Sequence, residues 1–310
     1  MNDIAVQDAL IASQKVLLQR YRCLFAAEIG IALDDCRAAS KWSDVGRAVD
    51  REAQRLAELA HRWDGSARVV LAVVLPDGSI RGVNRHLLVR SASAVKPVWA
   101  AAAMAAAGRD AVDRYAHGAL ALSDDTAAGR LIDLAGGIDA VNAWAAETAK
   151  LGNTRLAHWF ERLASSGLRP NLTTAQDLAL FYARLHQGEL LGIAETSALQ
   201  RWLRDTPRQL SGFDGALPDR LPRAIADRVV HKTGWLPPGC CRINESVIID
   251  AGLVTLPDGG WFAIAAASST TKGNYSTSVN WVALAACRIY VAISQDTHHQ
   301  CHRPQDPNPQ

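Results

Sequence analysis

Strand-like segments lie near both ends of this 310-residue chain, and a long helical stretch separates them. Residues 67–89 hold two runs of aliphatic residues joined by a Pro-Asp-Gly-Ser turn, which predicts a hairpin. From residue 92 to about 202 the chain is rich in alanine and leucine at helical spacing. Strand-like runs return at 228–235, 246–257 and 260–268. This order predicts one sheet built from distant segments with a helical subdomain docked on it, an α+β or α/β sandwich rather than a doubly wound nucleotide fold.

The two ends of the chain differ from this central part. An apolar stripe predicts a helix over residues 1–38, a second helix follows at 46–63, and a last helix covers about 276–293. The expected organisation is a helical extension at 1–45, a main domain at 46–293 and a disordered polar tail at 294–310. Within the main domain, the sheet part is expected at 46–91 and 225–293 and the helical part at 92–224. The stripe on the first helix also offers a surface for self-association.

Composition excludes two classes of partner. A net charge of +2, from 33 basic and 31 acidic side chains, is too even for a nucleic-acid-binding surface. No apolar run reaches the roughly 20 residues of a membrane span. The first residues lack the basic start and unbroken apolar stretch of a secretory signal, so we expect a cytoplasmic protein.

The cysteines show no regular spacing, and a reducing compartment would leave them as thiols. They are Cys23, Cys36, Cys240, Cys241, Cys287 and Cys301. The adjacent pair at 240–241 is a candidate redox pair or two small turn residues, and the turn is the favoured interpretation. The tail residues His298, His299, Cys301 and His302 are a candidate metal site or a solvated tail, and the solvated tail is favoured because zinc needs a rigid ligand set.

A candidate nucleophile begins the alanine-rich stretch. Ser93 and Lys96 are three residues apart, which puts both side chains on one helical face with Cβ atoms about 5–6 Å apart. A hydroxyl so placed can pass its proton to a neutral lysine amine, and its backbone N–H at a helix start can face an oxyanion. Ser269 and Lys272 have the same spacing, so this pattern alone leaves both serines open.

Two further motifs select between the serines. Ser123-Asp124-Asp125 reads alone as a helix N-cap, and Lys232-Thr233-Gly234 reads alone as a strand with one lysine. In the order Ser-x-x-Lys, Ser-Asp-Asn (here Ser-Asp-Asp) and Lys-Thr-Gly, the chain resembles class A β-lactamases and penicillin-binding proteins over about residues 46–293. The order favours Ser93, because Ser269 follows the Lys-Thr-Gly strand. The resemblance implies a β-lactamase-like α+β fold, with an antiparallel sheet flanked by helices and an all-helical subdomain.

The resemblance also implies catalytic roles. Ser93 would attack an amide or ester carbonyl, and Lys96 would take its proton. Ser123 would relay a proton to the leaving nitrogen. Lys232 would supply positive charge beside Ser123. No metal or cofactor is implied, and the expected partner is a small amide or ester substrate, one that can carry a carboxylate.

Other residues would bind the substrate. Thr233 would hydrogen-bond a substrate carboxylate, and Arg242 lies one residue out of step with the family's carboxylate-binding arginine. The backbone N–H groups of Ser93 and Trp235 would form the oxyanion hole. The indole of Trp235, where the family usually has a small residue, favours a bulkier, stacked substrate.

The departures from the family pattern bear on turnover. After the loop tryptophan, Phe160 stands where class A enzymes have the glutamate that activates the deacylating water, and Ala164 stands for the asparagine that helps to hold it. Glu161 is one position late. The arginine and aspartate that pin this loop are replaced, with His158 in the first place and a leucine or asparagine in the second. Efficient class A deacylation is therefore not expected.

Asp125 replaces the family's asparagine. An ionised carboxylate accepts from Lys96 but cannot donate to a substrate carbonyl, and it raises the pKa of Lys96. Either the substrate offers a donor at this point, such as an amine, or the site is weakened. The leading interpretation is an acyl-serine hydrolase or acyltransferase. The alternatives are a ligand-binding homologue without turnover and a weak genuine β-lactamase that uses Glu161 or no base.

Overall fold

The structure is a computed structural model. It describes residues 34–158, 170–207, 209–210, 213–214, 216–237, 245–271 and 275–301. The chain divides into two compact units, Met1–Arg47 and Ala48–Gln310. Because the described residues begin at 34, most of the helix expected over residues 1–38 lies outside them.

The first described helix, α2 (Asp34–Trp63), is continuous, although the sequence predicted a polar break before residue 46. The expected break contains neither glycine nor proline. Its polar side chains instead support the helix, since Arg47 donates to Ser43 at 2.9 Å and pairs with Asp44. Polar residues alone do not end a helix when they pair at i,i+3 and i,i+4.

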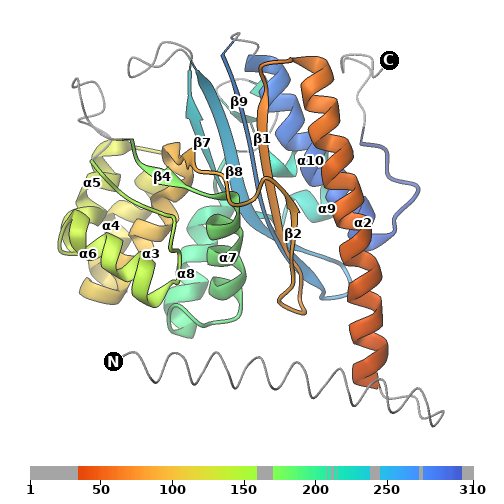
Figure 1. The fold of residues 1–310 in the computed structure, drawn as a ribbon. Coiled ribbons are helices and arrows are strands. Elements are labelled where there is room, and N and C mark those ends of the chain that lie inside the picture. Colours follow the sequence, from red (N-terminus) through yellow and green to blue (C-terminus); the bar gives the residue numbers. More distant parts are fainter. Residues whose placement is uncertain are drawn as a thin grey trace, which may run out of the picture. The chain divides into compact units, whose positions relative to one another are not determined.

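One antiparallel sheet organises the second unit, as the sequence predicted. Its strands run in the order β2-β1-β9-β8-β7, so the strands from the two ends of the chain meet at its centre (Figure 1). Arg68 of β1 lies opposite Ser269 of β9. The strands are β1 (Arg68–Val74), β2 (Ile80–Val83), β7 (Val230–Leu236), β8 (Ser246–Thr255) and β9 (Trp261–Thr270).

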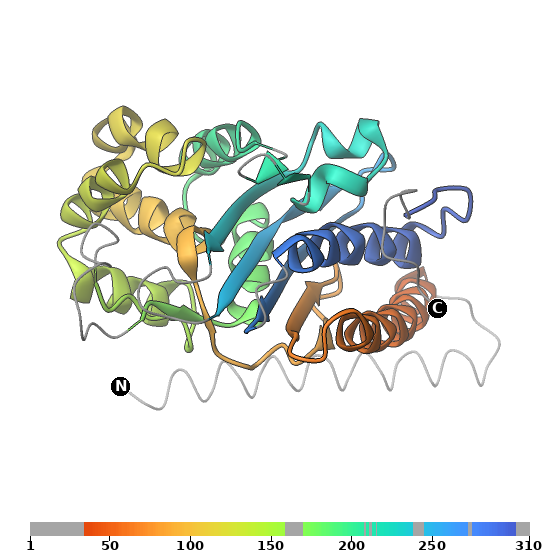
Figure 2. The ribbon, with the colours of Figure 1, turned by 90° about the horizontal axis from the view of Figure 1, so that it is seen from above.

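The helical part covers one face of the sheet (Figure 2). Its centre is α3 (Lys96–Ala107), whose residues 96–104 are all buried. Alanine fills much of this helix, so α4 and α5 can pack closely around it. The other helices here are α4 (Arg109–Leu120), α5 (Asp125–Leu134), α6 (Ile138–Ala143), η2 (Trp144–Thr148), α7 (Ala175–His186) and α8 (Ile193–Arg204).

Short elements connect these layers. A 3₁₀ turn, η1 (Ala92–Val95), leads into α3, and β3 (Val89–Arg90) pairs with β4 (Leu172–Thr173). The remaining elements are β5 (Gln209–Leu210), β6 (Phe213–Asp214), η4 (Leu217–Arg220) and α9 (Arg223–Ala226). Along the chain, β3 and η1 lead from the sheet into the helical part, and β5, β6, η4 and α9 lead from α8 back to β7.

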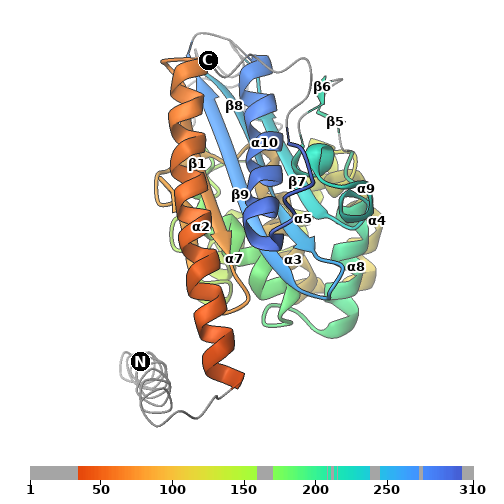
Figure 3. The same ribbon diagram turned by 90° about the vertical axis from the view of Figure 1, so that its right-hand side faces the viewer.

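The other face of the sheet carries α10 (Tyr275–Ser294) and the Ala48–Trp63 part of α2 (Figure 3). The Trp281 indole donates to the Leu56 carbonyl at 2.9 Å, and Arg288 pairs with Glu52 at 2.9 Å. By length and composition, α10 is apolar enough to cross a membrane. However, 72% of its apolar window is buried inside the fold, which is typical of a core helix.

The tail differs from two expectations. Cys287 and Cys301 form a disulfide, so the expected thiols are wrong for this pair. Residues 295–301, which lie in the tail expected to be disordered, contact the rest of the fold: Arg220 donates to the Cys301 carbonyl at 3.1 Å, and His299 lies 2.7 Å from the Arg220 carbonyl. These contacts also engage two of the tail's candidate metal ligands. Residues 302–310 lie outside the described residues.

Candidate active site

Ser93 lies in the sharp turn that begins the buried helix α3. Ala92 has a positive φ of 43°, which costs a non-glycine residue about 1–3 kcal/mol. Ser93 is partly exposed, whereas its neighbours in η1 are buried. Pro97 falls in the first turn of α3, where its missing N–H costs nothing. The turn therefore presents one hydroxyl at the surface of a rigid core.

Ser269 lies in a different environment. It sits within strand β9, paired with Val247 on one side and Arg68 on the other. A spacing of three residues on a strand does not place two side chains on one face, and Lys272 lies outside the described residues. Of the two serines, Ser93 is therefore the one that shares a helical turn with a described lysine.

Lys96 is fully buried and reaches the loop before α5. Its ammonium donates to the Ser123 carbonyl at 2.6 Å and to Asp125 Oδ1 at 2.7 Å, with the Ser123 hydroxyl at 3.4 Å. Burial lowers the pKa of Lys96, and the charge of Asp125 opposes this shift. Burial and the carboxylate therefore shift the pKa of Lys96 in opposite directions.

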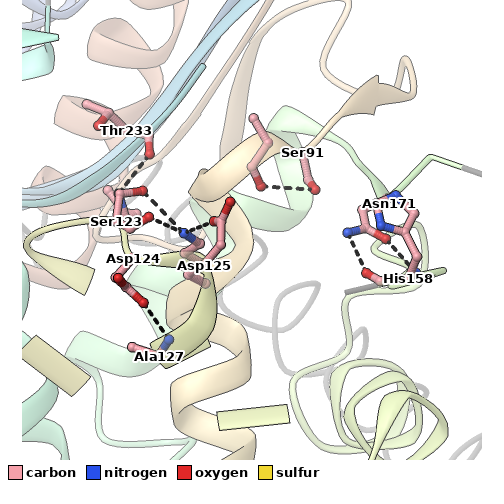
Figure 4. A network of polar contacts seen from close by, with 11 residues as sticks. Ser91, Ser123, Asp124, Asp125, Ala127, His158, Asn171 and Thr233 are labelled. Atoms are coloured by element: carbon pink, nitrogen blue, oxygen red, sulfur yellow. Dashed lines mark hydrogen bonds and ion pairs between the residues drawn. The ribbon is translucent and has the colours of Figure 1, made fainter. Parts of the chain in front are cut away.

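Ser123 is held in an unusual backbone conformation at the end of α4. Its φ is 59°, in the left-handed region that favours glycine. The next two residues diverge: Asp124 caps α5 by accepting from the Ala127 amide at 2.6 Å, whereas Asp125 turns toward Ser123 and Lys96 (Figure 4). The strained turn thus delivers one hydroxyl and one carboxylate to the same place.

Lys232 approaches Ser123 from strand β7. Its ammonium donates to the Ser123 hydroxyl at 3.1 Å and to the Thr233 carbonyl at 3.0 Å. Burial lowers the pKa of Lys232 to about 7, with the charge of Lys96 as the second cause. Lysines from two distant segments therefore converge on one serine, and Lys232 changes its charge near neutral pH.

Gly234 allows β7 to contact the turn that leads into α3. A Cβ at Gly234 would lie 2.7 Å from the Ala94 nitrogen and 2.9 Å from the Ser93 nitrogen. Any side chain here would push the two segments apart. Trp235 follows on the same strand, paired with Ile248, and is 37% exposed. The two backbone N–H groups expected to form an oxyanion hole thus come from segments in direct contact.

Sequence reasoning missed a buried pair behind Lys232. His231 Nδ1 lies 3.0 Å from Asp250, which also accepts from the Leu217 amide at 2.8 Å. Both side chains are buried, and the charge of Asp250 opposes the loss of the proton from Lys232. The available signal was Asp250, which interrupts the otherwise apolar run 247–254. A charged side chain at such a position is costly to bury without a partner.

The amide side chain of Asn171 bonds to the backbone of residues 157 and 158. Asn171 accepts from the backbone amides of Ala157 and His158 at 2.7 and 3.1 Å, and it donates to the His158 carbonyl at 3.0 Å. Figure 4 shows Asn171 and His158 side by side, apart from Ser123 and Asp125. Phe160, Glu161 and Ala164 lie outside the described residues, and so does Arg242.

Solved structures share this fold. A point mutant of PBP-A, solved as an acyl-enzyme complex with penicillin G, gives a TM-score of 0.66 at 21% identity, over 79% of this chain and 97% of that one. A β-lactamase from Streptosporangium roseum gives 0.67 at 17%, over 79% and 99%. A variant of the last common ancestor of Gram-negative class A β-lactamases gives 0.65 at 24%, over 81% and 100%.

Sequence comparison settles the family. No match is found among curated proteins. The model of the β-lactamase enzyme family matches residues 112–293, which is more than half of the chain and includes Ser123, Asp125 and Lys232. The chain therefore belongs to the β-lactamase enzyme family and is a β-lactamase-like serine hydrolase.

Proposed function

We propose that the protein uses Ser93 to cleave or transfer the acyl group of an amide or ester. The observation that carries this proposal is the convergence of Lys96 and Lys232 on Ser123, beside the turn that presents Ser93. Each lysine is buried, and burial lowers the pKa of each, to about 7 for Lys232.

The proposed acylation moves one proton along this cluster. The Ser93 oxygen bonds to the substrate carbonyl carbon while its proton passes to neutral Lys96. The carbon–nitrogen or carbon–oxygen bond of the substrate then breaks, and the leaving group receives a proton through the Ser123 hydroxyl. Backbone N–H groups of Ser93 and Trp235 stabilise the oxyanion in between.

The fate of the acyl-enzyme is proposed from the sequence. Phe160 and Ala164 provide neither a base nor a polar side chain to hold a water, so hydrolysis by the class A route should be slow. A long-lived acyl-serine favours transfer to an amine or alcohol. A ligand-binding homologue without turnover is the second candidate, favoured by these replacements. The complete Lys96, Ser123 and Lys232 cluster favours the enzyme.

Peptide mapping tests the nucleophile. After incubation with a β-lactam, the adduct should lie on the peptide that contains Ser93. Ser93→Ala should remove it, and Ser269→Ala, the matched control, should keep it. An adduct on Ser269, or an unchanged adduct in Ser93→Ala, would refute the assignment.

The charge of Lys232 should set the pH dependence of substrate choice. We compare an ester that bears a carboxylate with its neutral carboxamide, because both share every other titrating group. Lys232 is charged below its pKa of about 7 and neutral above it. The ratio of kcat/KM, carboxylate over carboxamide, should therefore fall as the pH rises through about 7, by roughly 10- to 100-fold if a charge-assisted hydrogen bond is lost.

Lys232→Arg provides the control, since a guanidinium keeps its charge throughout this range. In that variant the ratio should stay flat. A flat ratio in the unmodified protein would show that Lys232 does not bind the substrate carboxylate.

A further inference from the structure

Asp125 combines a buried contact with an open face. Its Oδ1 accepts from Lys96 at 2.7 Å, and the Lys96 side chain is completely buried. The Asp125 side chain itself is 51% exposed. Among the residues that the structure describes, its second oxygen has no hydrogen-bond partner. One side of the carboxylate therefore holds the candidate base, and the other side is open to a ligand.

The open oxygen selects for a cation. An ionised carboxylate only accepts hydrogen bonds, so it repels a carbonyl oxygen and attracts an ammonium group. Exposed Asp124 adds a second negative charge beside it, although its own oxygen is turned to the Ala127 amide. The local field thus favours a positive group on the substrate.

The position of Asp125 relates this selection to the acyl side of the substrate. Lys96 contacts Asp125 directly, and Lys96 is three residues from Ser93 on the same turn, about 5–6 Å away between Cβ atoms. A group bound to the open oxygen therefore lies close to a carbonyl that is attacked by Ser93. An amine on the acyl part of the substrate, near that carbonyl, fits this position.

The same contact restrains the base. Lys96 must be neutral to accept the Ser93 proton, and its ion pair with Asp125 stabilises the charged form. The Asp125 charge and hydrogen bond both raise the pKa of Lys96 against the effect of burial. A substrate ammonium on Asp125 would compensate that charge, and Lys96 would lose its proton more readily.

We propose that Asp125 selects acyl donors that carry a cationic amine on the acyl side of the scissile bond, and that this amine takes over the carboxylate and releases Lys96 to act as the base. The inference rests on the proposed acyl-serine function. The freed Lys96 gives its proton to solvent and then accepts the Ser93 proton as the new carbon–oxygen bond forms. A substrate without the amine leaves the ion pair between Lys96 and Asp125 intact. Asp125 therefore selects the substrate both by binding it and by activating Lys96.

Two penicillins provide a matched pair for the test. Benzylpenicillin and its α-amino analogue, ampicillin, differ only by one amine on the carbon next to the side-chain carbonyl, so the amine belongs to the acyl part that Ser93 would receive. The rate of acylation by each is measured by intact mass at pH 6.5. The unmodified protein should react with the amino compound at least about tenfold faster, and this preference should decline as the amine loses its proton near pH 8.

Three variants separate the explanations. Asp125→Asn should remove the preference by slowing the amino compound and accelerating benzylpenicillin, whereas Asp125→Glu, which keeps the charge, should retain the same sign of preference. Asp124→Asn is the matched control and should keep most of the preference, because Asp124 turns its oxygen to the Ala127 amide and asparagine also caps a helix well. Equal rates in the unmodified protein, or an unchanged ratio in Asp125→Asn, would overturn the inference. The absence of any adduct with either compound would overturn the proposed function itself.

Discussion

Replacing Lys96 with methionine should slow acylation of the protein by about 10²- to 10⁴-fold, the range that a positioned general base supplies. Lys96 is the one described amine that contacts both Ser123 and Asp125. Methionine is unbranched and apolar, so it fits the fully buried position while it removes the proton acceptor. The half-exposed Asp125 that is left behind can be hydrated, so the fold should survive.

The measurement is the rate of adduct formation with a β-lactam, followed by intact mass. Lys41→Met, on an exposed part of α2, is the matched control and should react at the normal rate. Circular dichroism checks that both variants are folded. Acylation of Lys96→Met within about twofold of the unmodified protein would mean that another group accepts the proton.

Replacing Phe160 with glutamate should shorten the lifetime of the acyl-enzyme, by up to about 10²- to 10⁴-fold if the new carboxylate activates a water. The prediction follows from the sequence, in which Phe160 directly follows the loop tryptophan. Phenylalanine cannot accept a proton, and an apolar ring beside the ester tends to exclude water. The readout is adduct mass against time after excess reagent is removed.

Glu161 provides the control for this experiment. Glu161→Gln should leave the lifetime of the adduct unchanged, because the neighbouring carboxylate is one position late for the family's base. A longer lifetime in Glu161→Gln would identify Glu161 as the base instead. An unchanged lifetime in Phe160→Glu would show that position 160 does not face the ester.

The sequence predicts the fold and the composition of the site because both depend on the order of strand patterns and motifs along the chain. Strand patterns at the two ends of the chain require one sheet, and β1 indeed pairs with β9. The structure then brings Lys96, Ser123 and Lys232 together, three residues that three separate motifs had indicated. Motif order favoured Ser93 over Ser269. Ser269 lies in strand β9, where a residue three positions further on faces the other side of the sheet.

The missed features depend on contacts that local pattern does not encode. His231 and Asp250 each read as an isolated polar residue in an apolar strand, and only the pairing of β7 with β8 brings them together. The composition of the tail indicates a polar, disordered segment, yet a disulfide attaches Cys301 to the buried Cys287. The open side of Asp125 is also a tertiary property, because exposure depends on how α5 packs.

The lifetime of the acyl-enzyme in the unmodified protein tests the central claim most directly. The protein is incubated with a β-lactam, freed of excess reagent and followed by intact mass in plain buffer. We predict a mass increase of one reagent molecule that persists through the time course and disappears when an amine acceptor is added, with no increase in Ser93→Ala. Rapid return to the original mass in plain buffer, or an adduct that forms without Ser93, would contradict this account.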